Sequence, residues 1–167
     1  MNPMREIRLE KVTLNMGAGE AGPQLEKSQK ILEKVSGKKI VVTRAHKRST
    51  FGVAKKRPIG AMTTLRNEPA RQLLENLLKG VENTLSKNCF DKNGNFSFGI
   101  KEYIHIPGTK YDPDVGILGL DVAVTLKRPG YRVKLRRIRP AKLGHKHRIT
   151  PEESMEWVKK EFAVKFE

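Results

Sequence analysis

Three groups of residues have types and spacings that could support chemistry: a glycine-rich segment, a histidine pair and an aspartate pair. Gly17, Gly19 and Gly22 form a GxGxxG pattern between a predicted strand and a predicted helix. Such a turn can bring backbone amides to the pyrophosphate of a dinucleotide. However, the preceding strand alternates in polarity, Pro23 follows the last glycine, and residues 38–42 lack the acid that would hold a ribose. We favour a tight strand-to-helix turn; a nucleotide-dependent oxidoreductase is the alternative, which nicotinamide-cofactor binding would reveal.

The other reactive side chains also lack the partners that chemistry requires. His145 and His147 lie close together, but no cysteine or second histidine pair completes a four-ligand metal site. Asp112 and Asp114 flank a proline, which favours a turn over an acid–base pair. Cys89 has no basic neighbour to activate it, and a lone cysteine cannot form an internal disulfide, which fits a reducing compartment. We therefore expect no enzyme activity, no metal and no cofactor.

Positive charge is concentrated in two segments of the chain. The protein has 34 Lys and Arg against 18 Asp and Glu, a net charge of +16. Residues 38–66 contain nine of these cations and residues 127–148 contain ten, with no acid in either segment, whereas the remainder has a balance of −3. Mixed charges would serve solubility equally well, so segregation favours an anionic polymer, above all a nucleic acid. A nonspecific basic chaperone or membrane-surface protein is the alternative; it would bind anionic vesicles and any RNA alike.

The length of 167 residues suits one domain with a substantial core, and we expect residues 1–167 to form it. No apolar run approaches the ~20 residues of a membrane span, and no signal-peptide core follows the N-terminus. These observations predict a cytoplasmic protein without a membrane partner.

The hydrophobic pattern predicts five strands and three helices. Alternating or β-branched residues predict strands at 7–16, 40–43, 59–65, 96–100 and 120–126, with a bulge where the alternation shifts at Glu10 and Lys11. Apolar stripes predict helices at 23–36, 67–85 and 151–162, the second including Val81 and Leu85. Thr150 and Glu153 form a capping box for the last helix. Half-polar strands and irregular alternation predict an α+β fold: a mostly antiparallel sheet with helices on one face.

Two basic extended loops follow from this pattern, at residues 48–57 and 127–149. Phe96 and Phe98 alternate with polar residues, so we expect them in the core. Phe51 lies among the cations of the first loop, where an aromatic ring suits stacking on a base or ribose. Tyr131, beside Arg132, is predicted to do the same.

Short motifs in a fixed order resemble those of a known family. They are NMGAGEA at 15–21, SGKK at 36–39, VTRA at 42–45, TFG at 50–52, PIGA at 58–61, TLR at 64–66, NFSFGIKE at 95–102 and GLDV at 119–122. Together they resemble the large-subunit ribosomal protein "L-five" family over residues 5–126 and the final helix. RPGY at 128–131 and KHRI at 146–149 resemble its archaeal and eukaryotic branch, named "L-eleven" in eukaryotes.

The resemblance implies an α+β fold and a structural role in the ribosome. It implies binding to 5S RNA in the central protuberance, beside an L-eighteen-type protein and large-subunit RNA. It also implies that the loop at 48–57 approaches the P-site transfer RNA, and that the protein contributes to a bridge with a small-subunit protein.

The expected RNA contacts can be assigned to individual residues. The resemblance carries 5S RNA contacts over to Asn15 and Thr64, and to Lys38, where the family commonly has glutamine; even spacing places Arg66 on the strand face of Thr64. The full 5S set is Asn15, Gly17, Lys38, Lys39, Arg44, Thr64 and Arg66. The transfer-RNA loop contributes Arg48, Thr50, Phe51, Lys55, Lys56 and Arg57. The second loop departs from the shorter bacterial form, and charge assigns its residues to ribosomal RNA, together with Lys47: Arg132, Lys134, Arg136, Arg137, Arg139, Lys142, His145, Lys146 and Arg148.

Overall fold

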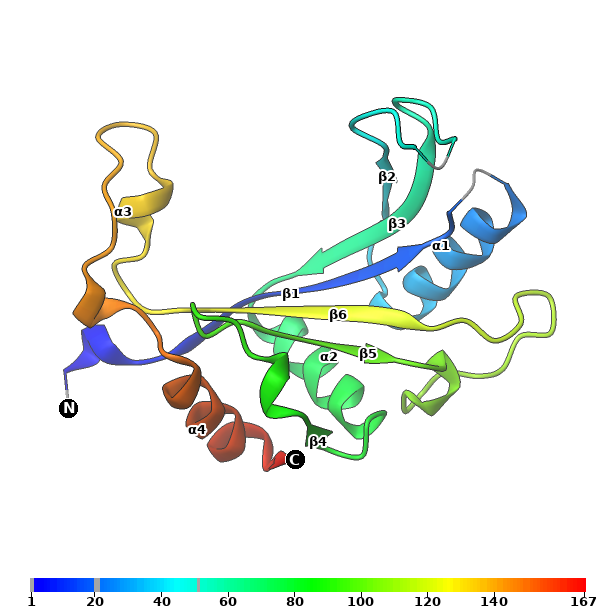
Figure 1. The fold of residues 1–167 in the computed structure, drawn as a ribbon. Coiled ribbons are helices and arrows are strands. Elements are labelled where there is room, and N and C mark those ends of the chain that lie inside the picture. The colour runs from blue at the N-terminus through cyan, green and yellow to red at the C-terminus, as the bar shows by residue number, and fades with distance from the viewer. Residues whose placement is uncertain (1, 20–21, 51) are drawn as a thin grey trace.

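A five-stranded antiparallel sheet organises the molecule. The computed structural model describes residues 2–19, 22–50 and 52–167. The strands are β1 (Arg8–Gly17), β2 (Val41–Arg44), β3 (Pro58–Leu65), β5 (Phe96–Ile100) and β6 (Leu120–Lys127). Their order across the sheet is β2-β3-β1-β6-β5, with every neighbouring pair antiparallel (Figure 1). The predicted α+β architecture is confirmed.

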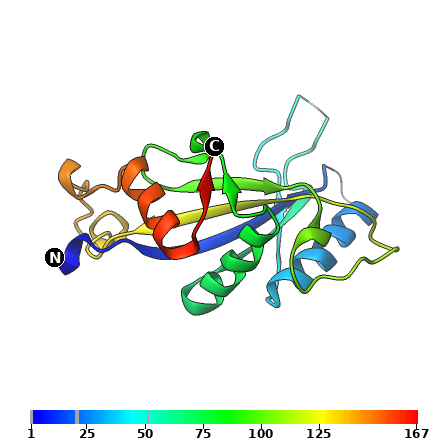
Figure 2. The same cartoon turned by 90° about the horizontal axis from the view of Figure 1, so that it is seen from below.

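Helices lie on one side of this sheet. They are α1 (Pro23–Ser36), α2 (Asn67–Lys79) and α4 (Pro151–Phe162); they lie below the sheet in Figure 1, and their side of the sheet faces the viewer in Figure 2. A four-residue helix, α3 (Arg132–Leu135), lies apart from them. Two short parallel strands, β4 (Thr84–Leu85) and β7 (Lys165–Phe166), form a separate pair, and 3-10 turns occupy Pro3–Arg5, Lys87–Cys89, Tyr103–His105 and His145–His147.

Period-two alternation explains why only one face is covered. The even-numbered residues of β1, Val12, Leu14 and Met16, are buried against the helices, as are those of β5 and β6. Leu32 of α1 and Leu74 of α2 supply the facing layer and are fully buried. The register between β1 and β6 shifts between Leu9 and Lys11, which confirms the predicted bulge. Burial of this apolar layer is the main force that holds the helices to the sheet.

The predicted helix boundaries hold in two cases and fail in one. Gly37 caps α1 in the left-handed conformation at φ 59°, and Thr150 and Glu153 form the expected capping box of α4. The extension of the second helix to Leu85 was wrong, because α2 ends at Lys79. Glu82 and Asn83 both adopt φ 54° and turn the chain, so that Leu85 pairs with the C-terminal strand instead of continuing the helical stripe.

Gly60 permits close packing of three strands. A Cβ atom at this position would lie 2.8 Å from the Met16 carbonyl oxygen and 2.9 Å from Thr43 Oγ1. We expect Gly60→Ala to lower the free energy of unfolding by about 1–3 kcal/mol, because backbone must move to admit the methyl group. Denaturant titration measures this. Gly99→Ala is the control, since its Cβ would meet Asp121 Oδ1 at an ordinary 3.7 Å; equal effects would contradict the explanation.

No helix within the described ranges has both the length and the apolar character needed to cross a membrane.

Candidate nucleic-acid interface

The face of the sheet opposite the helices carries small and polar side chains. Alternation places Thr13 and Asn15 of β1, Thr64 of β3 and Ala123 of β6 on this open face. Ser97 and Gly99 of β5 and Asp121 of β6 continue it in register, and all of these except half-buried Thr13 are exposed. This open face has no large side chain on β5, or on β6 before Lys127 at its end; Met62 of β3 also lies on it, opposite Asn15. A broad, shallow surface of this kind can lie against an extended partner.

Asn15 lies near the middle of the open face. Its register partners are Met62 on β3 and Asp121 on β6, and its side chain is exposed. Within the described part of the chain, the side-chain amide of Asn15 has no hydrogen-bond partner. An amide beside a carboxylate offers both donors and acceptors, which suits base edges and ribose hydroxyls better than phosphates. Sequence reasoning missed Asp121 as a site residue, although its place in an alternating strand put it on the polar face.

The other residues predicted for 5S RNA surround this centre without forming one cluster. Thr64 faces Thr13, with 3.4 Å between their hydroxyl oxygens, and Gly17 ends β1 at the same face. Arg66 lies just beyond β3 and approaches Glu10 at 4.0 Å. The remaining three, Lys38, Lys39 and Arg44, are exposed but lie at opposite ends of β2.

A basic hairpin loop connects β2 to β3. Backbone bonds from Ala45 N to Arg57 O (2.9 Å) and from Lys56 N to Ala45 O (2.8 Å) close its base. The loop residues predicted to contact RNA are all exposed where the structure describes them: Lys47, Arg48, Thr50, Lys55, Lys56 and Arg57. Phe51 lies outside the described residues. The loop therefore presents cations to solvent while its base is fixed to the sheet.

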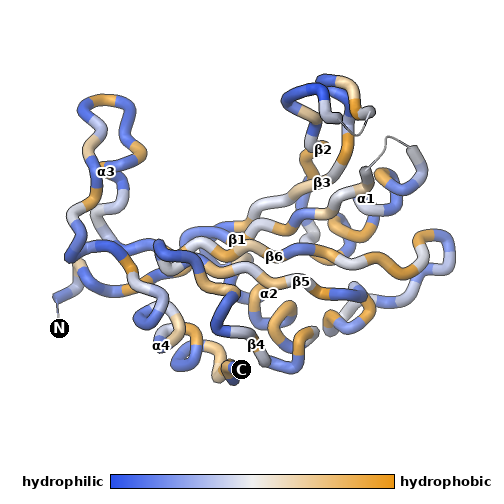
Figure 3. Tube along the Cα trace, viewed as in Figure 1, coloured by the Kyte–Doolittle hydropathy of each residue, from blue (hydrophilic) through white to orange (hydrophobic). Residues whose placement is uncertain are grey.

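The second basic loop, predicted at residues 127–149, begins at residue 128 because β6 includes Lys127, and we call residues 128–149 the basic arm. It extends from the end of β6 on the same side as the β2–β3 loop, at the other end of the sheet (Figure 1), and Figure 3 shows hydrophilic residues interspersed with hydrophobic ones along both. Its predicted RNA-binding side chains are exposed: Arg132, Lys134, Arg136, Arg137, Arg139, Lys142, His145, Lys146 and Arg148. The open face thus lies between two cationic projections.

Arg128 anchors the arm and is not a surface cation. It is 4% exposed, and its guanidinium donates to the carbonyl oxygens of His147 (3.4 Å) and Arg148 (3.1 Å) and to Glu153 Oε1 (2.8 Å). Burial favours a higher pKa for the Glu153 carboxyl, but hydrogen bonds from Arg128 and Thr150 outweigh it and leave that pKa below its usual range. The arm is therefore tied to the start of α4 through a charged, hydrogen-bonded pair.

The prediction that Tyr131 stacks on RNA was wrong. Its side chain is 8% exposed, and its hydroxyl accepts a hydrogen bond from Ile149 N at 3.1 Å. Burial raises the pKa of this phenol. His147 Nε2 lies 2.8 Å from the Pro129 carbonyl oxygen. The Tyr131 and His147 side chains therefore hold the first residues of the arm against its last residues. The prediction relied on the adjacent cation Arg132, and this local feature carries no information about packing between the two ends of the arm.

The residues considered for catalysis have other partners or none. Asp112 forms an ion pair with Lys34, which holds the pKa of that carboxyl below its usual range and ties the loop at 107–119 to α1. Its Oδ1 also accepts from Asp114 N at 3.2 Å, the bond expected of a turn. Cys89 is half-buried in a 3-10 turn. Within the described ranges, no three His, Cys, Asp or Glu side chains gather as a metal site would require.

Comparisons with known proteins match this chain to one ribosomal protein family along nearly its whole length. A family model described as "Ribosomal protein L5" matches residues 2–53, and a second model, for the C-terminus of the same ribosomal protein family, matches residues 58–157. A "Large ribosomal subunit protein uL5" from Methanosphaera stadtmanae is 46% identical over 168 residues, covering 100% of both chains. Proteins of that name from Sulfurisphaera tokodaii (48% identical; 98% of this chain, 94% of the relative) and Nanoarchaeum equitans (47%; 98% and 97%) are similar. The matches include the open face, the basic loop and the basic arm.

Proposed function

The chain belongs to the ribosomal protein L5 family, and from this premise we propose that it binds 5S ribosomal RNA across the open face of its sheet. It is a structural protein of the large ribosomal subunit and not an enzyme, and ribosomal RNA is its partner. The further proposals are that it attaches 5S RNA to large-subunit RNA in the central protuberance, beside an L-eighteen-type protein.

One observation carries the proposal: an uncovered polar sheet face lies between two cationic projections. The face supplies neutral donors and acceptors, chiefly Asn15 and Thr64, beside the acceptor Asp121, and these can distinguish bases and ribose hydroxyls. The projections supply cations, which neutralise phosphates without reading sequence. Specific contacts from the face and nonspecific phosphate contacts from the projections together allow a protein to bind one particular RNA.

The direct test is binding to 5S RNA from the same organism. We expect the logarithm of affinity to fall by about 0.7 or more per phosphate contact for each unit of log salt. We expect Asn15→Ala to weaken binding by about 1–3 kcal/mol, because the substitution removes the side-chain amide that would hydrogen-bond to the RNA. Filter binding across a salt series measures both quantities.

Asn88→Ala is the matched control, because Asn88 is exposed in a 3-10 turn away from β1. It should leave affinity unchanged. Equal binding to an unrelated stem-loop, or a flat salt response, would refute specific recognition; unchanged affinity of Asn15→Ala would remove Asn15 from the interface.

We propose further that the β2–β3 loop contacts P-site transfer RNA and that this edge contributes to a bridge with a small-subunit protein. Replacing Arg48 and Lys55 together by glutamine should weaken transfer-RNA binding to reconstituted particles at least about fivefold, because two exposed cations are lost. The matched control replaces Lys159 and Lys160 on the exposed side of α4. If both double variants behave alike, the loop has no specific role.

A further inference from the structure

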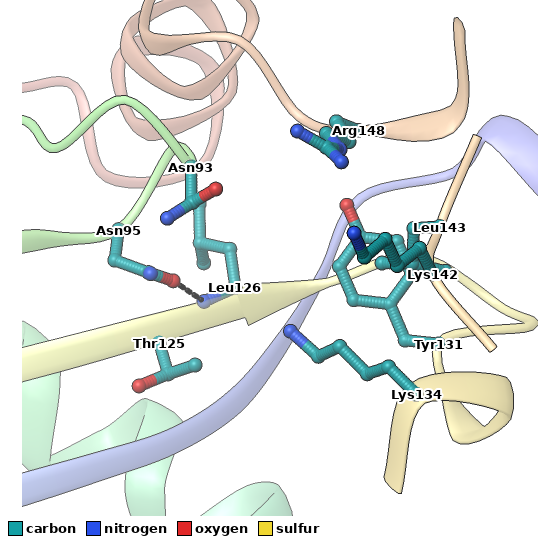
Figure 4. Close-up of a pocket in the computed structure, with 9 residues that line it drawn as sticks. All are labelled: Asn93, Asn95, Thr125, Leu126, Tyr131, Lys134, Lys142, Leu143 and Arg148. Atoms are coloured by element: carbon teal, nitrogen blue, oxygen red, sulfur yellow. Dashed lines mark hydrogen bonds between the residues drawn. The ribbon is translucent and has the colours of Figure 1, made fainter. Parts of the chain in front are cut away.

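A cavity of about 320 Å³ lies at the base of the basic arm, beside the ends of β5 and β6. Figure 4 shows Lys134, Lys142 and Arg148 of the arm on one side of it. Asn93 and Asn95, from the turn that precedes β5, lie on the other side. The cavity therefore joins the arm to the sheet, and its volume is near the lower end of about 300–1,000 Å³ for small-ligand sites.

Positive charge in this cavity is not balanced by the protein. Among the described residues, Lys134, Lys142 and Arg148 form no ion pair, and no carboxylate lines the cavity. Lys134 Nζ stands 5.1 Å from the centre of the Tyr131 ring, a cation–π contact that helps to position it. Asp91, in the same turn as Asn93, accepts from Asn93 Nδ2 at 3.3 Å and does not line the cavity. Three cations that share one cavity repel one another unless an anion joins them.

Asn95 adds a neutral donor with a fixed orientation. Its Oδ1 accepts a hydrogen bond from Leu126 N at 3.2 Å, as Figure 4 shows. The acceptor is therefore occupied, and the amino group is left as a donor at the cavity wall. Cations with an added amide donor form the usual environment of a bound phosphate.

We propose that this cavity is a phosphate-binding subsite for a single nucleotide. Lys134, Lys142 and Arg148 pair with the phosphate, and the Asn95 amino group donates to it. The cavity is larger than a phosphate group, and Tyr131 and Leu143 in its wall can contact the attached sugar or base. An RNA backbone or a free nucleotide can supply this phosphate; the first source rests on the proposed function, and the second does not.

The first experiment titrates the isotope-labelled protein with adenosine 5′-monophosphate and, separately, with adenosine, and follows the amide resonances. We expect the Asn95 side-chain resonance to shift with the nucleotide and not with the nucleoside. Asn95→Asp keeps the acceptor for Leu126 N–H but places a carboxylate against the phosphate, so nucleotide affinity should fall at least about tenfold. Lys142→Gln should also weaken it. Lys160→Gln removes the same charge from the exposed side of α4, outside the cavity lining, and is the control.

The second experiment measures binding of the same variants to deproteinised large-subunit ribosomal RNA, with 5S RNA in parallel. A loss of about tenfold for Asn95→Asp, against at most about twofold for Lys160→Gln, identifies the RNA backbone as the source. A nucleotide response without that loss identifies a free nucleotide. If Asn95→Asp matches Lys160→Gln in both experiments, the subsite is refuted. Unchanged unfolding midpoints show that the variants fold, and 5S binding tests the proposed function separately.

Discussion

Ala123→Glu is expected to lower affinity for 5S RNA by about hundredfold or more while leaving stability nearly unchanged. Ala123 is exposed on β6, in register with Thr13 of β1 and Ser97 of β5, and so lies within the open face. In the proposed 5S RNA complex, a glutamate here would occupy space next to the RNA and would oppose its negative charge. Like-charge contacts across an interface cost several kcal/mol, and about 1.4 kcal/mol corresponds to tenfold in affinity.

The matched control for this prediction is Gln72→Glu. Gln72 is exposed on α2, which covers the other face of the sheet, and the substitution adds the same charge. Its effect on 5S affinity should be small and should disappear as salt rises. If the two variants lose affinity equally, the effect is one of net charge, and the open face is not the binding surface.

Arg128→Met is expected to lower the free energy of unfolding by about 1–3 kcal/mol, because buried acceptors lose their donor while the Glu153 side chain, 38% exposed, keeps some contact with water. The substitution leaves Glu153 and the carbonyl oxygens of His147 and Arg148 without their donor. Methionine retains most of the apolar volume, so the loss reports on the polar contacts. Denaturant titration measures the change. Arg137→Met, at an exposed position of the arm, is the control and should stay within about 0.5 kcal/mol.

The pH dependence of stability provides a second readout for the same pair. Because the pKa of Glu153 is lowered in the folded protein, the carboxylate stabilises it above the unfolded pKa of about 4.3, and this contribution is lost as pH falls through the folded value. Arg128→Met removes the hydrogen bond that lowers this pKa. The variant should therefore lose less stability than the original protein between about pH 5 and pH 3. Parallel curves would show that the pair is not responsible.

Local sequence signals predicted the elements well where structure depends on neighbours in the chain. Alternation and one β-branched run identified the five strands of the sheet, and a shift in the alternation located the bulge near Glu10, because side-chain direction follows directly from backbone period. The end of α2 was not predicted, since Val81 and Leu85 continue an apolar stripe that tertiary pairing with β7 overrides. Distant packing also decided Arg128 and Tyr131, which resemble surface residues in a basic segment but are buried.

The candidate site shows the same division. The resemblance to a family supplied Asn15 and Thr64, and alternation alone was enough to place both on one face. No local pattern indicated that Asn95 and Lys142 line one cavity, because a long connection and a whole strand separate them. Charge counting indicated the class of partner, but only the three-dimensional arrangement separated anchoring cations from exposed ones.

The central position of β1 has a consequence for how the protein is made. Val12 pairs with Leu65 on one side and with Val124 on the other, partners 53 and 112 residues later in the chain. During synthesis, the first strand to appear keeps an unpaired edge until residues 120–127 have emerged. Contacts so distant in sequence slow folding, and an open strand edge can pair with another chain. Early capture of the nascent protein, by RNA or by a chaperone, would shorten that exposure.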